Sequence, residues 1–188
     1  MTYKSFRELA AAEQENRDYR ITMRRGLRQN FLIAAIHGQN IEPGTSDIAN
    51  DIAGDRHGFY AFDVLNPAKD CKMMHVSSNA FDEPRLQKLS SEHKEVITIH
   101  GCRDKWGAEI RLGGLDEELK EKLLKAFNAA GLPARHDREL FTGANPQNVC
   151  NQGKTHEGVQ IEIPRQLRDD AEKRRQIVNT IRTVISTY

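Results

Sequence analysis

The hydrophobic pattern of the chain predicts a series of short strands separated by helices. Residues 31–36 form a continuous apolar run, which is typical of a strand buried on both faces. Residues 158–163 alternate instead, so that apolar side chains point one way while Gln160 and Glu162 point the other. On these criteria we expect strands at residues 19–24, 31–36, 58–62, 73–76, 96–99 and 158–163.

Helical periodicity appears between these strands. The clearest helix runs from Asp116, its expected N-cap, to Gly131. Its expected apolar stripe consists of Leu119, Leu123, Phe127 and Ala130. Further helices are expected after a Ser5–Glu8 capping box, from Thr45 or Ser46 to Ala53, from Pro84 through Leu89 with Asp82 as a possible cap, and over residues 169–188. Strands that alternate with helices predict a single-domain α/β fold over residues 1–188, with a mixed central sheet flanked by helices.

Composition narrows the class of protein. The 188 residues include 28 basic and 27 acidic side chains, a formal charge of +1, so the chain has no electrostatic footprint for nucleic acid. The three cysteines lack paired spacing and are expected to be free thiols in a chain made in the cytoplasm. No apolar segment approaches the ~20 residues of a membrane helix, and no apolar signal core begins the chain. We therefore expect a soluble protein without a membrane partner; release by host lysis would leave no mark in the sequence.

Side chains of the types that bind metal ions follow two of the apolar runs. His37 ends the first run and is followed by a turn-rich loop that contains Glu42, while His100 ends the run at residues 96–99. Two imidazoles and one carboxylate leave zinc a fourth position for water, as in hydrolytic zinc sites. Such a site needs a nearby carboxylate to accept the water's proton, and Glu162 is the best candidate. Each of these residues alone is more often structural than functional.

Six ordered blocks of sequence carry a resemblance to a known family. They are residues 37–45 (HGQNIEPGT), 75–84 (HVSSNAFDEP), 99–101 (IHG), 113–119 (GGLDEEL), 145–151 (NPQNVCN) and 158–163 (GVQIEI). In this order they resemble the poly-γ-glutamate hydrolase family of Bacillus and its phages, over about residues 20–168. The resemblance implies a zinc-carboxypeptidase-like fold, one zinc ion held by His37, Glu42 and His100, and Glu162 as catalytic base. The implied reaction is hydrolysis of the γ-amide bonds of poly-γ-glutamate, with which phages strip the polymer from capsulated hosts. We expect a monomer.

The substrate of that family is a polyanion, so arginines near the candidate loops are candidates for binding its carboxylates. Arg56, Arg85, Arg103 and Arg111 fall there, and Arg103, three positions after His100, is our candidate for contacting substrate or steadying the oxyanion. The candidates for substrate binding are Asn79, Arg85, Asn148 and Asn151. Two positions depart from the family pattern: Ala80 stands where a histidine is usual and Gln152 where an arginine is usual. Both departures bear on substrate specificity, and neither touches a proposed ligand.

Three alternatives remain open. The first keeps the metal but changes the substrate to a small γ-glutamyl or N-acyl amino acid, cleaved by an amidohydrolase or an exo-acting carboxypeptidase. The second is a cysteine hydrolase that uses Cys150 or Cys102 with a histidine. The third is a catalytically silent binding module, which the intact set of ligands and base argues against.

Overall fold

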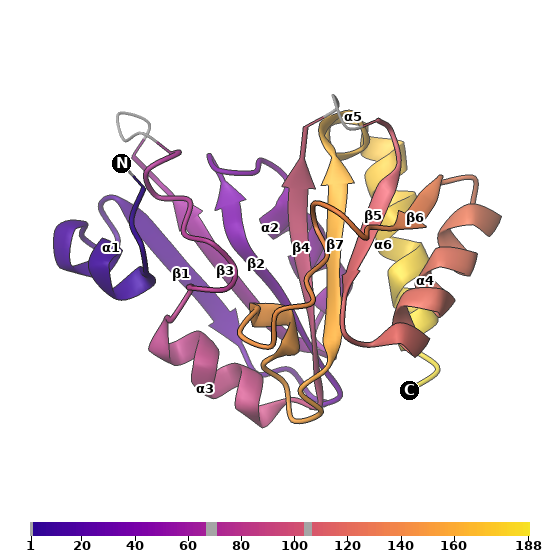
Figure 1. Ribbon diagram of the computed structural model, residues 1–188, viewed down its shortest axis with the longest axis horizontal. Helices are drawn as coiled ribbons and strands as arrows, with labels where there is room; N and C mark the ends of the chain where they lie inside the picture. Colours follow the sequence, from indigo (N-terminus) through magenta and orange to yellow (C-terminus); the bar gives the residue numbers. More distant parts are fainter. Residues whose placement is uncertain (1, 67–70, 104–106) are drawn as a thin grey trace.

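The computed structural model describes residues 2–66, 71–103 and 107–188. These residues form a single-domain α/β fold with one mixed sheet of seven strands between helices (Figure 1). In the order in which they lie side by side, the strands are β1 (Tyr19–Arg24), β3 (Gly58–Val64), β2 (Phe31–Gln39), β4 (Glu95–Cys102), β7 (Gly158–Pro164), β5 (Ile110–Gly114) and β6 (Ala134–His136). The predicted fold class is confirmed.

The direction of the strands decides where a site can form. β3, β2, β4 and β7 run parallel to one another, whereas β1 and β5 pair with them in antiparallel fashion. The carboxyl ends of β2, β4 and β7 therefore lie at the same edge of the sheet (Figure 1). From β2 the chain crosses to β3 on one side and then returns to β4 on the other, so the gap between β2 and β4 is a topological switch point. Ligands of open α/β sheets bind in the crevice that such a point creates.

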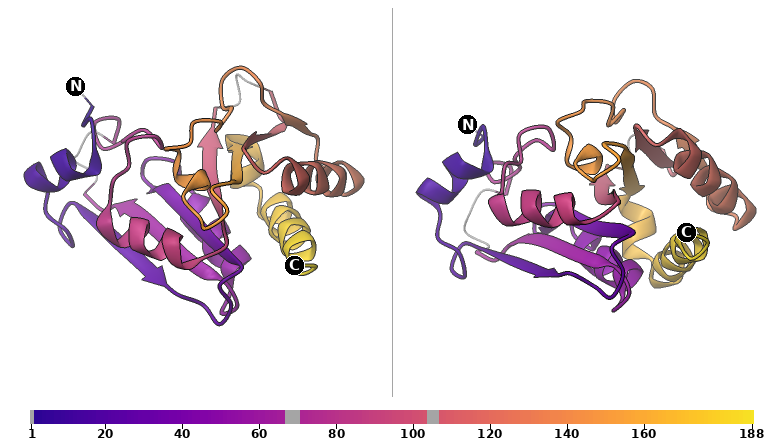
Figure 2. Two further views of the ribbon diagram at one scale, coloured as in Figure 1. Left: turned by 60° about the horizontal axis from the view of Figure 1, so that its bottom comes forward. Right: turned by 90° about the horizontal axis from the view of Figure 1, so that it is seen from below.

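Helices cover both faces of the sheet (Figure 2). They are α1 (Phe6–Ala12), α2 (Thr45–Ala53), α3 (Pro84–Glu92), α4 (Glu117–Ala129), α5 (Arg165–Asp169) and α6 (Ala171–Ile185), with a 3₁₀ helix at Val149–Asn151. α2, α4 and α6 pack on one face, where their apolar side chains join those of the strands in one buried cluster. The other face is covered by α1, α3 and the loop before α3, which bury a second cluster rich in aromatic rings. Within the described ranges, no helix is long and apolar enough to cross a bilayer.

The strand expected at residues 73–76 is wrong. Met74 and Val76 are buried, at 1% and 0% exposed, but they lie in a loop that packs under the second face of the sheet rather than in a strand. Both side chains belong to the second buried cluster and so anchor this loop against the sheet. The edge of the sheet on this side is formed by β1. The loop matters for the site, since its backbone contacts His37.

Three smaller expectations also need correction. Glu83, not Asp82, caps α3, with its side chain accepting a hydrogen bond from the Leu86 N–H at 2.7 Å. Ala130 lies beyond the last residue of α4 and is exposed, so the apolar stripe of that helix ends at Phe127. β5 and β6 were not predicted, because β5 is a five-residue strand that ends in two glycines and β6 has only three residues.

Candidate metal centre

The end of β2 aims His37 into the crevice at the switch point. The pairing of β2 with β3 shifts register between Ala35 and Gly38, a bulge that re-aims the side chain beside it. Gly38 has no room for a Cβ, which would lie 1.9 Å from Ser46 Oγ. His37 Nε2 lies 2.7 Å from the Val76 carbonyl oxygen and must donate a proton to it. Its other ring nitrogen, Nδ1, is thereby left with a lone pair facing the crevice.

A short loop returns Glu42 to the same point. The Glu42 N–H donates to the His37 carbonyl at 3.0 Å, and the Thr45 hydroxyl donates to the Glu42 carbonyl at 2.9 Å. The backbone N–H of Gly101, at the end of β4, donates to Glu42 Oε2 at 2.8 Å. These bonds fix the carboxylate, so that its Oε1 lies 3.1 Å from His37 Nδ1.

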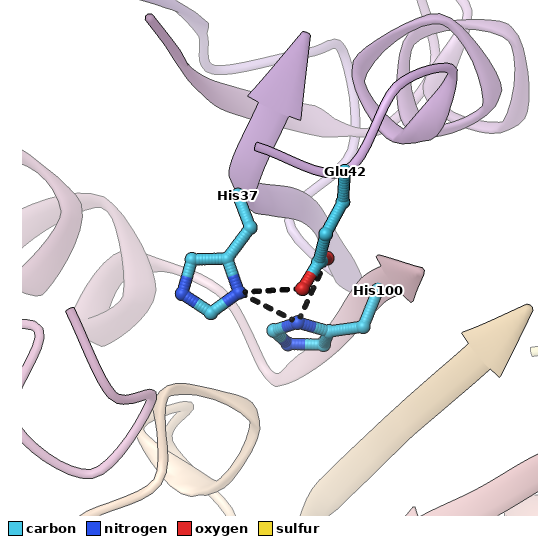
Figure 3. A group of neighbouring side chains, drawn as sticks. All are labelled: His37, Glu42 and His100. Atoms are coloured by element: carbon cyan, nitrogen blue, oxygen red, sulfur yellow. Dashed lines mark hydrogen bonds and ion pairs between the residues drawn. The ribbon is translucent and has the colours of Figure 1, made fainter. Parts of the chain in front are cut away.

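His100, from the end of β4, completes the group (Figure 3). Its Nδ1 lies 3.2 Å from His37 Nδ1 and 3.5 Å from Glu42 Oε2, and the three ligand atoms lie within 4.8 Å of one another. Zinc binds histidine nitrogens at about 2.0–2.1 Å in tetrahedral geometry, which sets neighbouring ligand atoms about 3.3 Å apart. The spacing of the two nitrogens therefore fits one zinc-sized ion.

Electrostatics also favour a cation here. Burial alone would raise the pKa of Glu42, yet the neighbouring imidazoles of His37 and His100 hold that pKa well below its usual value. Burial lowers the pKa of His37, whereas the pKa of His100 is raised because the nearby Glu42 carboxylate outweighs the effect of burial. Two buried imidazole nitrogens and the half-buried Glu42 carboxylate thus face one another. Only a proton or a metal ion between them makes such an arrangement favourable.

Glu162 lies beside this group on β7. It stands opposite His100 in the β4–β7 register and is 5% exposed. Burial raises the pKa of Glu162 to about 7; the charge of His100 opposes the rise and that of Glu42 adds to it. The Gln160 side-chain amide donates to Glu162 Oε1 at 3.2 Å, and Asn148 in turn donates to Gln160 at 3.0 Å. A buried carboxyl poised near neutrality is the state that a general base requires.

The three candidate ligands, His37, Glu42 and His100, lie at the floor of a cleft of about 560 Å³. The rest of its lining comes from β7 and from loops that follow β4, precede α3 and precede the 3₁₀ helix. The lining residues are His37, Glu42, His75, Ser77–Asn79, His100–Arg103, Leu140–Asn145, Asn148, Gln160 and Glu162. One wall of the cleft is held by Asp137, whose Oδ1 accepts the backbone N–H groups of Glu139, Leu140 and Phe141.

The structure brings together only part of the predicted substrate contacts. Asn79, Asn148 and Arg103 line the cleft, and Arg103 is exposed there without an ion pair to any described residue. Arg85 and Asn151 do not line it. Arg56 and Arg111 do not line it either.

Arg85 and Asn151 have structural partners instead. Both terminal nitrogens of Arg85 bind Glu15 at 3.0 Å, and its Nε binds Glu83 at 2.8 Å. Asn151 is 1% exposed, and its side-chain amide donates to the carbonyls of Gly143 and Asn145 at 2.8 and 2.9 Å. Asn151 therefore shapes the loop that lines the cleft without facing the cleft itself.

Ala80 and Gln152, the two departures from the family pattern, line a second cavity next to this cleft. Of the residues that line this cavity, Asn79 alone also lines the cleft. The departures therefore lie outside the cleft that contains the ligand group.

Two residues of the site were missed. The ring of His75 stacks on that of His37, with centroids 3.9 Å apart, and its Nε2 lies 3.5 Å from Glu42 Oε1. Its position in the block at residues 75–84 was the available signal. Arg168 is 4% exposed and donates to the carbonyl oxygens of Ile163 and Pro43, so it ties the Glu42 loop to the end of β7. No local pattern marked Arg168, since its bond to the Glu42 loop is to the carbonyl of Pro43, which is 125 positions away in sequence.

The cysteines give no support to a cysteine hydrolase. Cys102 and Cys150 are buried, and burial raises the pKa of each thiol to about 12. A nucleophilic cysteine needs the opposite shift, because the thiolate is the reactive form.

Comparison with known proteins identifies the family. The family model described as poly-γ-glutamate hydrolase matches residues 3–187. The chain belongs to this family. Among curated relatives of this chain, the UPF0714 protein YndL of Bacillus subtilis strain 168 is 32% identical over 163 residues, which cover 86% of this chain. The same alignment covers 63% of YndL, so the chain spans less than two-thirds of the length of that relative.

Two solved structures share the fold of this chain. A bacteriophage poly-γ-glutamate hydrolase superposes with a TM-score of 0.91 at 24% identity, covering 99% of this chain and 97% of that one. A structure described as the zinc-free apo form of YndL superposes with a TM-score of 0.89 at 27% identity, covering 98% and 96%.

Proposed function

We propose that this protein is a zinc-dependent hydrolase that cleaves γ-glutamyl amide bonds of poly-γ-glutamate. The observation that carries the proposal is the convergence of His37 Nδ1, His100 Nδ1 and the Glu42 carboxylate in a cleft beside a second, buried carboxyl. Membership of the poly-γ-glutamate hydrolase family supports the substrate. The role that we propose for this reaction is to strip the polymer from capsulated host cells.

His37, Glu42 and His100 would hold one zinc ion, because two nitrogens and one oxygen at this spacing suit its tetrahedral preference. The description of a relative's structure as zinc-free also favours zinc. When bound, zinc would lower the pKa of its water to about 7 and polarise the amide carbonyl. His75 and the Gly101 N–H would keep Glu42 in place for this task.

Glu162 would act as the general base. Its pKa of about 7 lets it accept a proton from the attacking water near neutral pH and then pass that proton to the leaving nitrogen. Gln160 and Asn148 would hold its carboxyl group in one orientation. Arg103, exposed at the cleft, would bind the α-carboxylate of the glutamyl unit or the developing oxyanion.

Metal analysis together with viscometry tests this proposal. Purified protein loaded with zinc should retain one ion per chain and should cleave the polymer, and chelation should abolish cleavage. His37→Ala should lose both the ion and activity, whereas His136→Ala, which alters a histidine outside the cleft, should keep both. A protein that binds no divalent metal and still cleaves would overturn the proposal.

A small-molecule amidohydrolase or an exo-acting carboxypeptidase remains the second candidate function, since a cleft open to solvent admits small amides as well. Viscosity separates these functions from ours. An endo-acting enzyme lowers the viscosity of a long polymer before free glutamate appears, whereas an exo-acting enzyme releases monomer first. Light scattering of the same samples would check the predicted monomer.

A further inference from the structure

A second cavity, of about 500 Å³, lies beside the catalytic cleft. We call it the amide cavity. Its lining consists of Ser5, Asn79–Asp82, Leu86, Gln87, Ser90, Gln147, Val149 and Gln152. Asn79 lines the cleft as well, and the Val149 N–H donates to the Ser78 carbonyl at 3.1 Å. That bond joins the two segments that stand between the cleft and the cavity, so a chain lying over Asn79 can reach both.

The rim of the amide cavity is polar but uncharged. Four exposed amide side chains stand around it: Asn79, Gln87, Gln147 and Gln152. Of the described residues that line the cavity, none is a cation. The one carboxylate, Asp82, is paired with Arg7 at 3.2 Å.

The floor of the cavity is apolar with one hydroxyl. Phe81, Leu86 and Val149 lie there and are at most 4% exposed. Ser90 is 1% exposed, and its Oγ has no hydrogen-bond partner among the described residues. An unpaired buried hydroxyl is unfavourable, so a ligand amide that reached it would gain a hydrogen bond at little cost.

We propose that the amide cavity is a second substrate subsite that accepts an uncharged unit joined to the γ-glutamyl group cleaved in the cleft. The reaction rests on the proposed function, and the inference adds the class of substrate. Asparagine and glutamine side chains donate to and accept from an amide, and the apolar floor contacts aliphatic carbon. An α-carboxylate placed here would lose part of its hydration without gaining a cation. A γ-glutamyl chain whose units on one side of the cleaved group are neutral, such as α-carboxamides, is therefore expected to be cleaved faster than poly-γ-glutamate itself.

Matched oligomers test the subsite. Two γ-linked glutamate oligomers of equal length are compared: one carries a free α-carboxylate on every unit, and the other carries α-carboxamides on one side of a central γ-glutamyl unit. Carboxamides are placed on each side in turn, since the direction of the bound chain follows from which version is preferred. Wild-type protein loaded with zinc should cleave one carboxamide version with kcat/KM at least about tenfold above that of the carboxylate oligomer.

Two rim variants should reverse this preference. Gln152→Arg and Gln87→Lys each place a cation at the exposed rim and should bring the ratio to about one or below, by improving cleavage of the carboxylate oligomer. Gln29→Arg adds the same charge at an exposed position outside both cavities and should leave the ratio unchanged. Cleavage of both oligomers at equal rates by wild type, or a preference for the carboxylate, would overturn the subsite.

Binding measured without turnover separates this inference from the proposed function. In Glu162→Gln, the methyl resonances of Leu86 and Val149 should shift on adding the carboxamide oligomer and not the carboxylate oligomer. If wild type cleaves neither oligomer but these methyl groups shift selectively, the proposed reaction is wrong and the subsite stands. If cleavage occurs without selective shifts, the reaction stands and the subsite is wrong.

Discussion

The cleft with the candidate ligands and the amide cavity share Asn79 but differ in how their polar groups are placed. The cleft concentrates ionisable side chains that are nearly buried, including His37, His100 and Glu162. The amide cavity keeps neutral amides at its exposed rim and apolar side chains at its floor. Buried charges are costly and persist where they hold a cation or move a proton, whereas neutral amides can select a ligand at little cost. Our two proposals accordingly place the reaction in the cleft and the selection of substrate in the amide cavity.

The largest expected effect comes from the base. Glu162→Gln should lower kcat by about 10²–10⁴-fold, because the amide cannot accept the proton of water. Zinc content should stay unchanged, since Glu162 is not one of the three ligand residues. Steady-state kinetics on both oligomers should give the same factor, as the amide cavity takes no part in proton transfer.

Glu157→Gln is the matched control, because Glu157 is exposed and lies outside both the cleft and the amide cavity. A loss confined to one oligomer would show that Glu162 contributes to selection and would break the division between the two cavities.

A smaller effect is expected at His75. His75→Ala should weaken zinc affinity by about 10–100-fold, because the imidazole both stacks on His37 and contacts Glu42. His75→Phe keeps a stacked ring but lacks the nitrogen that faces Glu42, so it should recover part of the loss. Competition with a zinc-binding dye measures the affinities. Unchanged affinity in both variants would show that His75 does not position the ligands.

The pH dependence should report the buried carboxyl. The pKa of Glu162 is raised from its ordinary 4.5 to about 7 in the folded protein. Metal-free protein should therefore lose stability as pH rises from about 4.5 to about 7, where the unfolded chain has already ionised this group and the folded protein still keeps it neutral. Chemical denaturation of wild type and Glu162→Gln across this range measures the effect, which should vanish in the variant.

Protonation of Glu162 should also set the pH below which kcat/KM falls. Catalysis needs the Glu162 carboxylate, so kcat/KM should fall about tenfold for each pH unit below its pKa. A bound cation favours the carboxylate, which places this pH for the zinc-loaded enzyme at or below about pH 7. A fall that begins above pH 8, measured with initial rates, would assign the base to another residue.

The sequence predicted most of the sheet because hydrophobic patterns follow burial. The run at residues 31–36 is buried on both faces, and the alternation in β7 places Gln160 and Glu162 opposite the apolar core, as observed. Residues 73–76 show the limit of this reasoning, because apolar residues can anchor a loop as well as build a strand. Short segments such as β6 depend on their neighbours for definition and carry too little pattern to be recognised.

The structure brings predicted site residues together where their side chains follow strand ends. Parallel strands bring their carboxyl ends to one edge of a sheet. Once both strands were recognised, His37 and His100 were therefore expected to lie at the same edge. Arg85 and Asn151 show why polar residues on loops were harder to place. Their partners, Glu15 and the carbonyl of Gly143, are determined by the tertiary fold and not by local spacing.

A change of ionic strength should produce the smallest effect on the kinetics. It should also show whether a charged group of the substrate lies in the cleft or in the amide cavity. Arg103 is an exposed cation at the cleft, so raising salt from about 0.05 M to about 0.5 M should increase KM for both oligomers by about two- to fivefold, and Arg103→Gln should remove that dependence. Gln152→Arg should add salt dependence for the carboxylate oligomer alone, because only that oligomer places a charge in the amide cavity. If salt affected the two oligomers equally in Gln152→Arg, the added cation would be acting at long range, and the amide cavity would not contact the substrate.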